Sequence, residues 1–197
     1  MSMLLSLIGR PDREQIMGTR RRWAIAAASA AAVLLVVAGA GLPAYVFPPT
    51  EKVGTADLIY VIGPPTIERI RAAEALRDQG VADRILISVP LEGEQSAKNQ
   101  SICDEDYVDC VHPKPFTTAG EAGVLNDYAP GERVVVLTFT PHVARTRYIF
   151  DRCYSGQTVV EPVDASLNIV EWAYQYAYQS VAFVKAMVSK CPDARVS

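Results

Sequence analysis

ERVVVLTFTPHVARTR, from Glu132 to Arg147, is the stretch of sequence that decides the fold. Val134 to Leu137 form an apolar run rich in β-branched residues, which predicts a buried strand. Thr140 is a suitable helix N-cap and Pro141 suits the first helical position, where its missing N–H has no cost. The stretch therefore predicts a strand followed directly by a helix.

His142 falls in the first turn of that predicted helix, and Arg145 lies one turn later on nearly the same side. A helix N-terminus after a strand offers free backbone N–H groups and a partial positive charge. Together with Arg145, this arrangement favours an anion at the turn. A helix start with a surface His142 and a solvated Arg145 explains the same residues equally well.

Upstream, a second strand, a helix and a third strand occupy a short stretch of chain. Asp57 to Ile62 form an apolar run of strand length that ends at Gly63 and two prolines. Thr66 can cap the following helix, which ends at Gly80, and Arg84 to Val89 form the next strand. This is the size of a parallel crossover unit.

Downstream of that unit the pattern is less regular. Residues 91–116 show no clear period. Thr118 and Glu121 have capping-box spacing, which predicts a helix from Thr118 to about Tyr128. After the helix that begins at Pro141, residues 158–163 predict a fourth strand, which Pro162 marks as an edge strand. Residues 166–191 predict a long closing helix.

Alternating strands and helices predict an α/β fold, a Rossmann-like parallel sheet with helices on both faces. In such sheets ligands bind beyond the carboxyl ends of the strands. This rule brings the polar residues that follow the strands onto one rim: Gly63 to Thr66, Ser88, Thr118, Glu121, Thr138, Thr140, His142 and Arg145.

The N-terminal part predicts a membrane anchor. Trp23 to Phe47 carry no charged side chain, and at about 1.5 Å per residue a helix of this length exceeds the roughly 30 Å hydrocarbon core. Residues 1–22 hold five arginines against two acidic residues, which places them in the cytoplasm as a short tail. Residues 48–55 then form a linker, and residues 56–197 form an extracytoplasmic domain. A cleaved signal peptide, ending near Ala38-Gly39-Ala40, is the competing interpretation.

This arrangement makes the chain a single-pass protein of the plasma membrane, with the lipid bilayer as its first partner. The net charge of -3 combines a basic N-terminal tail with an acidic remainder. No basic patch appears in the later part of the chain, which argues against nucleic acid as a partner.

The four cysteines lie only in the part predicted to be exported, where disulfides are stable. Cys103 and Cys110 bracket a short acidic loop, whereas Cys153 and Cys191 end two predicted helices, so we favour Cys103–Cys110 and Cys153–Cys191 among three connectivities. A metal site of Cys103, Cys110 and His112 is the rival. Its spacing matches no common zinc motif, so no metal is predicted.

Five pieces of the sequence, in order, resemble the SanA/YdcF/ElyC-like family, an envelope-associated domain of unknown function. The resemblance covers about residues 56–190. It rests on DLIYVIGPP from Asp57, on Glu68-Arg69-Ile70, on Arg84 to Ser88, on Thr118 to Ala122, and on Val136 to Arg145, which is similar to the family's His-x-x-Arg motif.

The resemblance implies a Rossmann-like fold with links to envelope integrity and to peptidoglycan or lipid-carrier metabolism. The chain departs from the family pattern where Gly63-Pro64-Pro65 replaces a run of glycines and where Val89-Pro90 follows Ser88. A first loop poor in glycine, in an extracytoplasmic domain, argues against a nucleotide cofactor, so none is expected.

Two functions fit these observations. In the first, the domain is a tethered envelope enzyme or binding domain for an anionic, phosphorylated envelope intermediate, with His142 as general acid or base and a pKa near 6.5. Glu121 would orient His142 or a water, and Arg147 would be a solvated neighbour. The expected ligand-binding residues are Gly63, Thr66, Arg69, Ser88, Thr118, Thr140 and Arg145.

In the second, the domain is a non-catalytic binding or scaffold module that docks onto envelope-synthesis proteins. The polar rim favours a small molecule, and the proline-stiffened loops favour a fixed scaffold.

Overall fold

The computed structural model describes residues 13–164, 166–192 and 195–196. The chain divides into two compact units, Met1–Gly41 and Leu42–Ser197. In the first, helix α1 (Arg13–Gly41) begins well before the predicted Trp23, so the second half of the expected cytoplasmic tail is helical. The rest of that tail, residues 1–12, lies outside the described residues. The segment Thr19–Val46 is long and apolar enough to cross a membrane.

The second unit is built on a five-stranded parallel sheet in the order β3-β2-β1-β5-β6. The central strand β1 is buried along its whole length, and its neighbour β5 is buried from Val134 to Thr138, as is typical of strands covered on both faces. The strands are β1 (Leu58–Val61), β2 (Ile85–Ser88), β3 (Val108–Val111), β5 (Arg133–Phe139) and β6 (Gln157–Val163).

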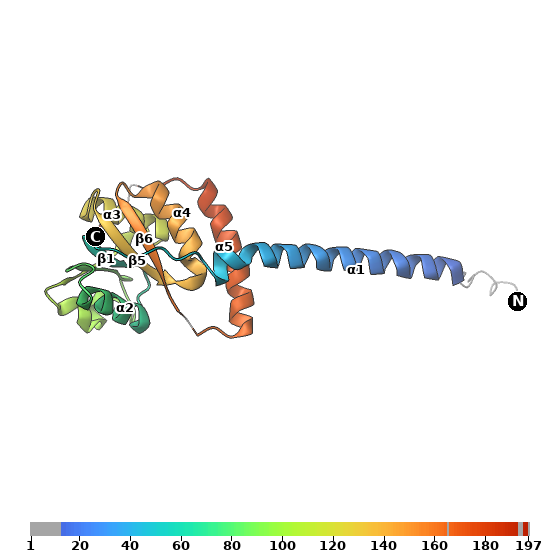
Figure 1. The fold of residues 1–197 in the computed structure, drawn as a ribbon, viewed down its shortest axis with the longest axis horizontal. Helices are drawn as coiled ribbons and strands as arrows, with labels where there is room; N and C mark the ends of the chain where they lie inside the picture. Colours follow the sequence, from blue (N-terminus) through green and yellow to red (C-terminus); the bar gives the residue numbers. More distant parts are fainter. Residues whose placement is uncertain (1–12, 165, 193–194, 197) are drawn as a thin grey trace, which may run out of the picture. The chain divides into compact units, whose positions relative to one another are not determined.

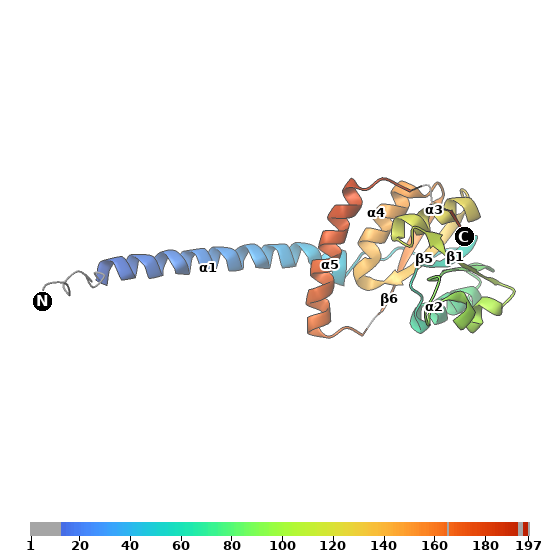
Figure 2. The same cartoon turned by 180° about the vertical axis from the view of Figure 1, so that it is seen from behind.

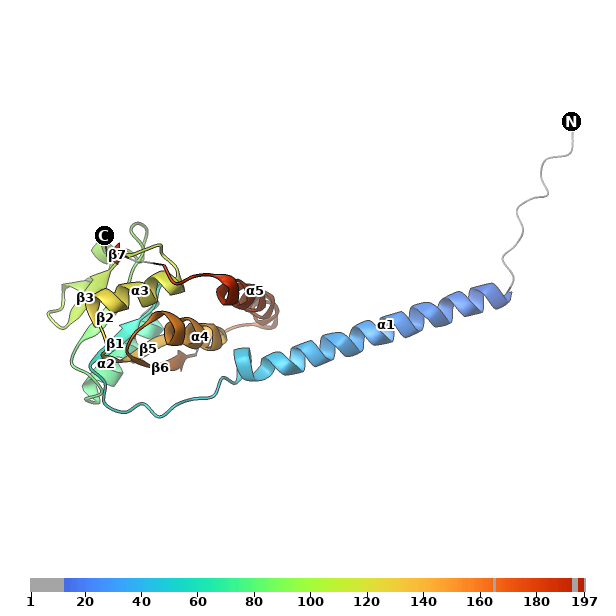
Figure 3. The same ribbon diagram turned by 90° about the horizontal axis from the view of Figure 1, so that it is seen from above.

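Helices cover both faces of this sheet, as Figures 1 and 2 show from opposite sides. Leu58 and Tyr60 of β1 pack with α3 (Thr118–Tyr128) and α4 (Val143–Cys153) on one face. Ile59 and Val61 alternate with them and pack with α2 (Ile67–Asp78) on the other face. Helix α5 (Ile169–Val188) lies beside α4 (Figure 3). The predicted Rossmann-like α/β class is confirmed.

The strand order places a topological switch point between β1 and β5. From β1 the chain moves through β2 to β3 in one direction, and from β5 it moves to β6 in the other. The helices that follow β1 and β5 lie on opposite faces, which leaves a crevice beyond the carboxyl ends of these two neighbouring strands.

The sequence prediction of four strands was incomplete. Strand β3 lies inside residues 91–116, for which no period was recognised. Only Val108 and Val111 of this strand are buried, so the strand is short, half polar and at the sheet edge. Residues 91–116 also contain two 3₁₀ turns, Ala97–Asn99 and Ser101–Asp104. Strand β4 (Pro113–Lys114) pairs with β7 (Arg195–Val196) in a small second sheet. The edge position predicted for β6 is confirmed.

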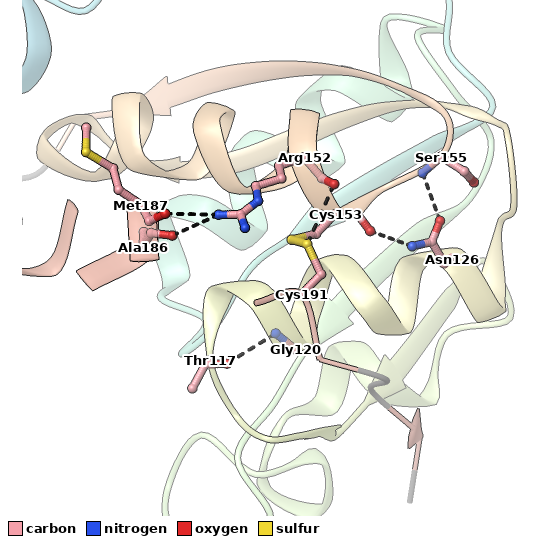
Figure 4. The surroundings of a disulfide bond; sticks show 9 residues. All are labelled: Thr117, Gly120, Asn126, Arg152, Cys153, Ser155, Ala186, Met187 and Cys191. Atoms are coloured by element: carbon pink, nitrogen blue, oxygen red, sulfur yellow. Dashed lines mark hydrogen bonds between the residues drawn. A yellow bond between two sulfur atoms is a disulfide. The ribbon is translucent and has the colours of Figure 1, made fainter. Parts of the chain in front are cut away.

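Both predicted disulfides are present. Cys103–Cys110 closes the acidic loop with a Cα–Cα distance of 5.6 Å, and Cys153–Cys191 joins the end of α4 to the segment after α5 with a distance of 5.4 Å. Arg152 supports the second link, because it donates to the carbonyls of Ala186 and Met187 at 3.3 Å (Figure 4). Helix α5 is therefore fixed to α4 at its C-terminal end.

Two element boundaries differ from the prediction. Helix α5 begins after Asn168, whose side chain accepts from the N–H groups of Val170 and Glu171 in a capping box. At the start of the second unit, Leu42–Val46, within the predicted anchor Trp23 to Phe47, form a short π-helical turn. Tyr45 in this turn packs edge-to-face on Tyr176 of α5, with ring centroids 5.0 Å apart.

Candidate functional site

The crevice at the switch point is a cleft of about 660 Å³. It is bounded by the loop after β1, the N-terminal turns of α3 and α4, and one side of α5. Six of the residues predicted for the site line it: Gly63, Arg69, Thr118, Glu121, His142 and Arg145. The fold therefore brings together the polar residues that follow β1 and β5, as the rim prediction requires.

His142 is buried at the floor of this cleft, with two threonine hydroxyls as its partners. Thr138 Oγ1 lies 3.0 Å from Nδ1, and Thr118 Oγ1 lies 3.3 Å from Nε2. Burial, and then the charges of Arg145 and Arg69, hold the pKa of His142 well below its ordinary value of 6.5. The expectation of a pKa near 6.5 is corrected, because at neutral pH this imidazole is uncharged and both of its nitrogens are held by neutral groups.

Glu121 is also buried, but it does not orient His142 as the sequence suggested. Its Oε1 accepts from the backbone N–H of Gly63 at 2.6 Å. Burial raises the pKa of Glu121, and the Ser88 hydroxyl, the Gly63 N–H, Arg69 and Arg145 act in the opposite direction. Gly63 is required for this approach, because a Cβ there would lie 2.8 Å from the Ser88 carbonyl oxygen. The carboxyl group thus joins α3 to the end of β1.

The position at which α3 begins explains why Thr118 and Glu121 line the cleft. The sequence predicted Thr118 as the N-cap in a capping box with Glu121, but the N-cap is Thr117, whose hydroxyl accepts from the Gly120 N–H at 3.1 Å. This shift of one residue turns Thr118 and Glu121 into the cleft. Similarly, Thr140 does not cap α4: Thr140–His142 form a 3₁₀ turn that begins after Phe139.

Arg69 reaches the cleft from the first turn of α2. Its Nη1 donates to the carbonyl oxygen of Ile62 at 2.8 Å, and its guanidinium lies 5.9 Å from the ring centroid of Phe139. The Phe139 ring lies 5.7 Å from the His142 ring, so these three side chains lie in sequence across the cleft floor. Burial lowers the pKa of Arg69, although an arginine remains charged at neutral pH.

Arg145 reaches the cleft from the first turn of α4. Its Nε donates to Oε1 of the fully buried Gln179 at 3.0 Å, and Gln179 in turn donates to Gln175 at 3.1 Å. Burial is also the largest effect lowering its pKa. Within the described part of the chain, neither Arg145 nor Arg69 forms an ion pair with a carboxylate. Two partly buried positive charges therefore face one cleft without a matching anion in contact.

Three other predicted residues lie near the cleft but not in its lining. Ser88 is fully buried behind Gly63. Thr66 lines a smaller adjoining hollow of about 390 Å³ beside Arg69. The Thr140 hydroxyl donates to Asp164 at 3.3 Å, at the edge of the same hollow. Arg147 is not a solvated neighbour, because it pairs with Glu51 at 3.2 Å and donates to the Val160 carbonyl.

Sequence reasoning missed the aromatic and amide side chains that shape the cleft. Phe139 stands within the stretch that decided the fold, but nothing in that pattern shows that its ring lies between Arg69 and His142. Tyr178 and Gln179 come from α5, which the sequence predicts only as a long closing helix, with none of its residues assigned to the site. The remaining cleft residues from α5 and its continuation are Tyr174, Gln175, Ala182, Lys185, Ala186, Ser189, Lys190 and Pro192.

The arrangement suits proton transfer beside an anion. A neutral buried imidazole can accept a proton, and a buried carboxyl with a raised pKa can hold one. The residues of the rival metal site serve other purposes here, because Cys103 and Cys110 are joined in a disulfide and His112 Nδ1 contacts the Val89 carbonyl at 2.9 Å. Residues 13–164 and 166–192 contain no cluster of three or more His, Cys, Asp or Glu side chains that could hold a metal.

Comparison with known proteins gives no further information about this site. No protein-family model, curated protein or solved structure matches this chain. The site is therefore interpreted from its own residues.

Proposed function

We propose that this domain binds an anionic, phosphorylated intermediate of cell-envelope assembly in the cleft at the switch point. The observation that carries the proposal is the pair Arg69 and Arg145, which face one cleft with no carboxylate partner among the described residues. A buried cation without a counter-ion costs several kcal/mol, which a bound phosphate would offset through charge-assisted hydrogen bonds.

The short helical turn at Thr140–His142 and the start of α3 supply further attraction for an anion. Backbone N–H groups at these two N-terminal turns lie at the same end of the sheet as the two guanidinium groups. Glu121, on the other hand, introduces one acidic group into the cleft. Burial raises its pKa, and the Ser88 hydroxyl, the Gly63 N–H, Arg69 and Arg145 act in the opposite direction.

We further propose that His142 and Glu121 carry out proton transfer on the bound ligand. His142 is held neutral with its ring position fixed by Thr138 and Thr118, which suits a general base. Glu121 is the other buried titratable group that lines the cleft, and we assign it the complementary proton transfer. The two groups come from α3 and the turn before α4, and both line the same cleft.

The setting we propose is the outer side of the plasma membrane, with α1 as a single-pass anchor. The arginines at positions 20–22 favour a cytoplasmic N-terminus, and two disulfides fit an oxidising compartment. The resemblance to the SanA/YdcF/ElyC-like family supports a substrate from peptidoglycan or lipid-carrier metabolism.

A thermal-shift titration of the full chain in detergent micelles tests the binding proposal. Sugar phosphates and a short polyprenyl phosphate are the probes, because both carry the phosphate that the cleft is proposed to hold. A ligand at about 100 times its Kd should stabilise the protein by about 2.7 kcal/mol. Arg145→Ala and Arg69→Ala should each lose most of this response.

Arg71→Ala is the matched control, because Arg71 lies exposed on the same helix as Arg69 and does not line the cleft. This variant should respond as the unaltered protein does. Equal responses of all three variants would contradict the proposed site, and no response of the unaltered protein to any phosphorylated probe would contradict the proposed ligand class.

A further inference from the structure

Helix α5 has an apolar face that none of the described residues of the second unit covers. On this face Val170, Val181 and Val188 are 76%, 72% and 80% exposed. The helix is about 30 Å long at 1.5 Å per residue, and the exposed residues recur along its whole length at helical spacing. The exposed large apolar and aromatic side chains include Val170, Tyr174, Tyr178, Val181, Val184 and Val188.

The opposite face of the same helix is used within the protein. Gln179 is fully buried and holds Arg145, while Phe183 packs against Tyr148 of α4 with ring centroids 5.3 Å apart. The disulfide from Cys191 to Cys153 fixes the chain just after the helix. The helix is therefore held in place on one side, and its exposed apolar stripe is a stable surface of the fold.

The turn with which the second unit begins contacts this helix directly. Segment Thr19–Val46 ends in the turn Leu42–Val46, and Tyr45 in that turn packs on Tyr176 of α5. Ser180 Oγ, one turn further along α5, donates to the Tyr45 hydroxyl at 3.2 Å. The last residues of the segment that is apolar enough to cross a membrane are thus in contact with α5.

We propose that α5 lies in the interface of the same bilayer that α1 crosses, with its exposed apolar stripe in contact with lipid. Tyr174 and Tyr178, which are 63% and 48% exposed, are of a residue type that concentrates at membrane interfaces. Lys185 and Lys190, near the end of the helix, suit anionic headgroups. A patch of this length is unusual on a monomeric domain surrounded by water. This second membrane contact is independent of which ligand the cleft binds.

Spin-label accessibility on the full chain, reconstituted in vesicles that contain anionic and neutral phospholipids, tests the proposal. The native cysteines of the described fold are paired, so single replacements Val181→Cys and Val184→Cys each provide one label site on the exposed stripe. Lys98→Cys, on an exposed 3₁₀ turn between β2 and β3, is the matched control. Collision rates with oxygen, which partitions into lipid, are compared with those of a water-soluble nickel complex.

Labels at 181 and 184 should collide mainly with oxygen, and the label at 98 mainly with the nickel complex. Predominant nickel collisions at all three positions would overturn the proposal. Spin–spin broadening at 181 or 184 that disappears on dilution with unlabelled protein would also overturn it, because the stripe would then be covered by a second copy of the chain. Two stripe positions are used so that misfolding of one variant leaves the test intact.

Discussion

His142 illustrates how the surroundings of one side chain decide its chemistry. An exposed histidine titrates near pH 6.5, but here burial and two nearby guanidinium groups oppose the charged form. The sequence placed His142 and Arg145 on the same side of a helix start, and this is what the structure shows. It did not indicate that Thr138 and Thr118 bind the ring, because Thr118 comes from an element 24 residues away in the chain.

The lowered pKa of His142 predicts a dependence of stability on pH. Below about pH 6.5 the unfolded chain takes up a proton at this site and the folded protein does not, so the free energy of unfolding should fall by up to about 1.4 kcal/mol per pH unit. Urea unfolding at several pH values between 5 and 7 measures this slope. His142→Gln should remove it, and His112, which is present in both proteins, cancels in the comparison.

Glu121 acts with the opposite sign, because its raised pKa contributes stability that is lost as pH rises above its ordinary value of 4.5. For this reason the difference between the unaltered protein and His142→Gln is the informative quantity. An identical pH slope in the two proteins would show that residue 142 titrates normally in the fold.

At the scale of elements, the sequence predicted the strands that consist of continuous apolar runs, but it did not predict a short strand of mixed apolar and polar residues. The strands around Ile59 and Val135 follow from continuous apolar runs, whereas in β3 two valines flank Asp109 and the disulfide-bonded Cys110. The sequence predicted the helix starts to within a few residues. The N-cap of α3 is nevertheless Thr117 and not Thr118, and this difference of one residue places the side chains of Thr118 and Glu121 in the cleft and not in a capping box. Local sequence signals do not distinguish adjacent threonines.

The two disulfides should differ in what they contribute to the stability of these elements. Cys153 and Cys191 are 38 residues apart and Cys103 and Cys110 only 7, so loop-closure entropy predicts losses of about 4 and about 2.5 kcal/mol when each pair is replaced by serine. Urea unfolding of the two double variants measures the difference. The first variant should also show faster hydrogen exchange along α5, since it releases the segment after this helix.

Replacing Cys103 and Cys110 is the matched control for α5, because that pair links the turn Ser101–Asp104 to β3 and does not involve α5 or the segment after it. Its exchange rates along α5 should not change. Equal protection of α5 in both variants would mean that packing on α4, and not the covalent link, holds the helix in place.

At the scale of the whole molecule, the chain combines an apolar N-terminal helix with a domain whose cleft carries two arginines that form no ion pair with any carboxylate among the described residues. The α/β class and the region of the cleft could be predicted from the order of strands and helices, because parallel strands deliver the residues after them to a common edge. The contribution of α5 to the cleft could not be predicted. Gln179 and Tyr178 occur in a helical pattern that equally fits simple packing, and only the fold places them beside Arg145.

The most direct test of the central claim is a crystal structure of the full chain soaked with a sugar phosphate. The account predicts a phosphate group in the cleft at the carboxyl ends of β1 and β5, in hydrogen-bond contact with the guanidinium groups of both Arg69 and Arg145. A phosphate bound only elsewhere, for example beside Lys185 and Lys190, with Arg69 and Arg145 making no contact to it, would contradict the account.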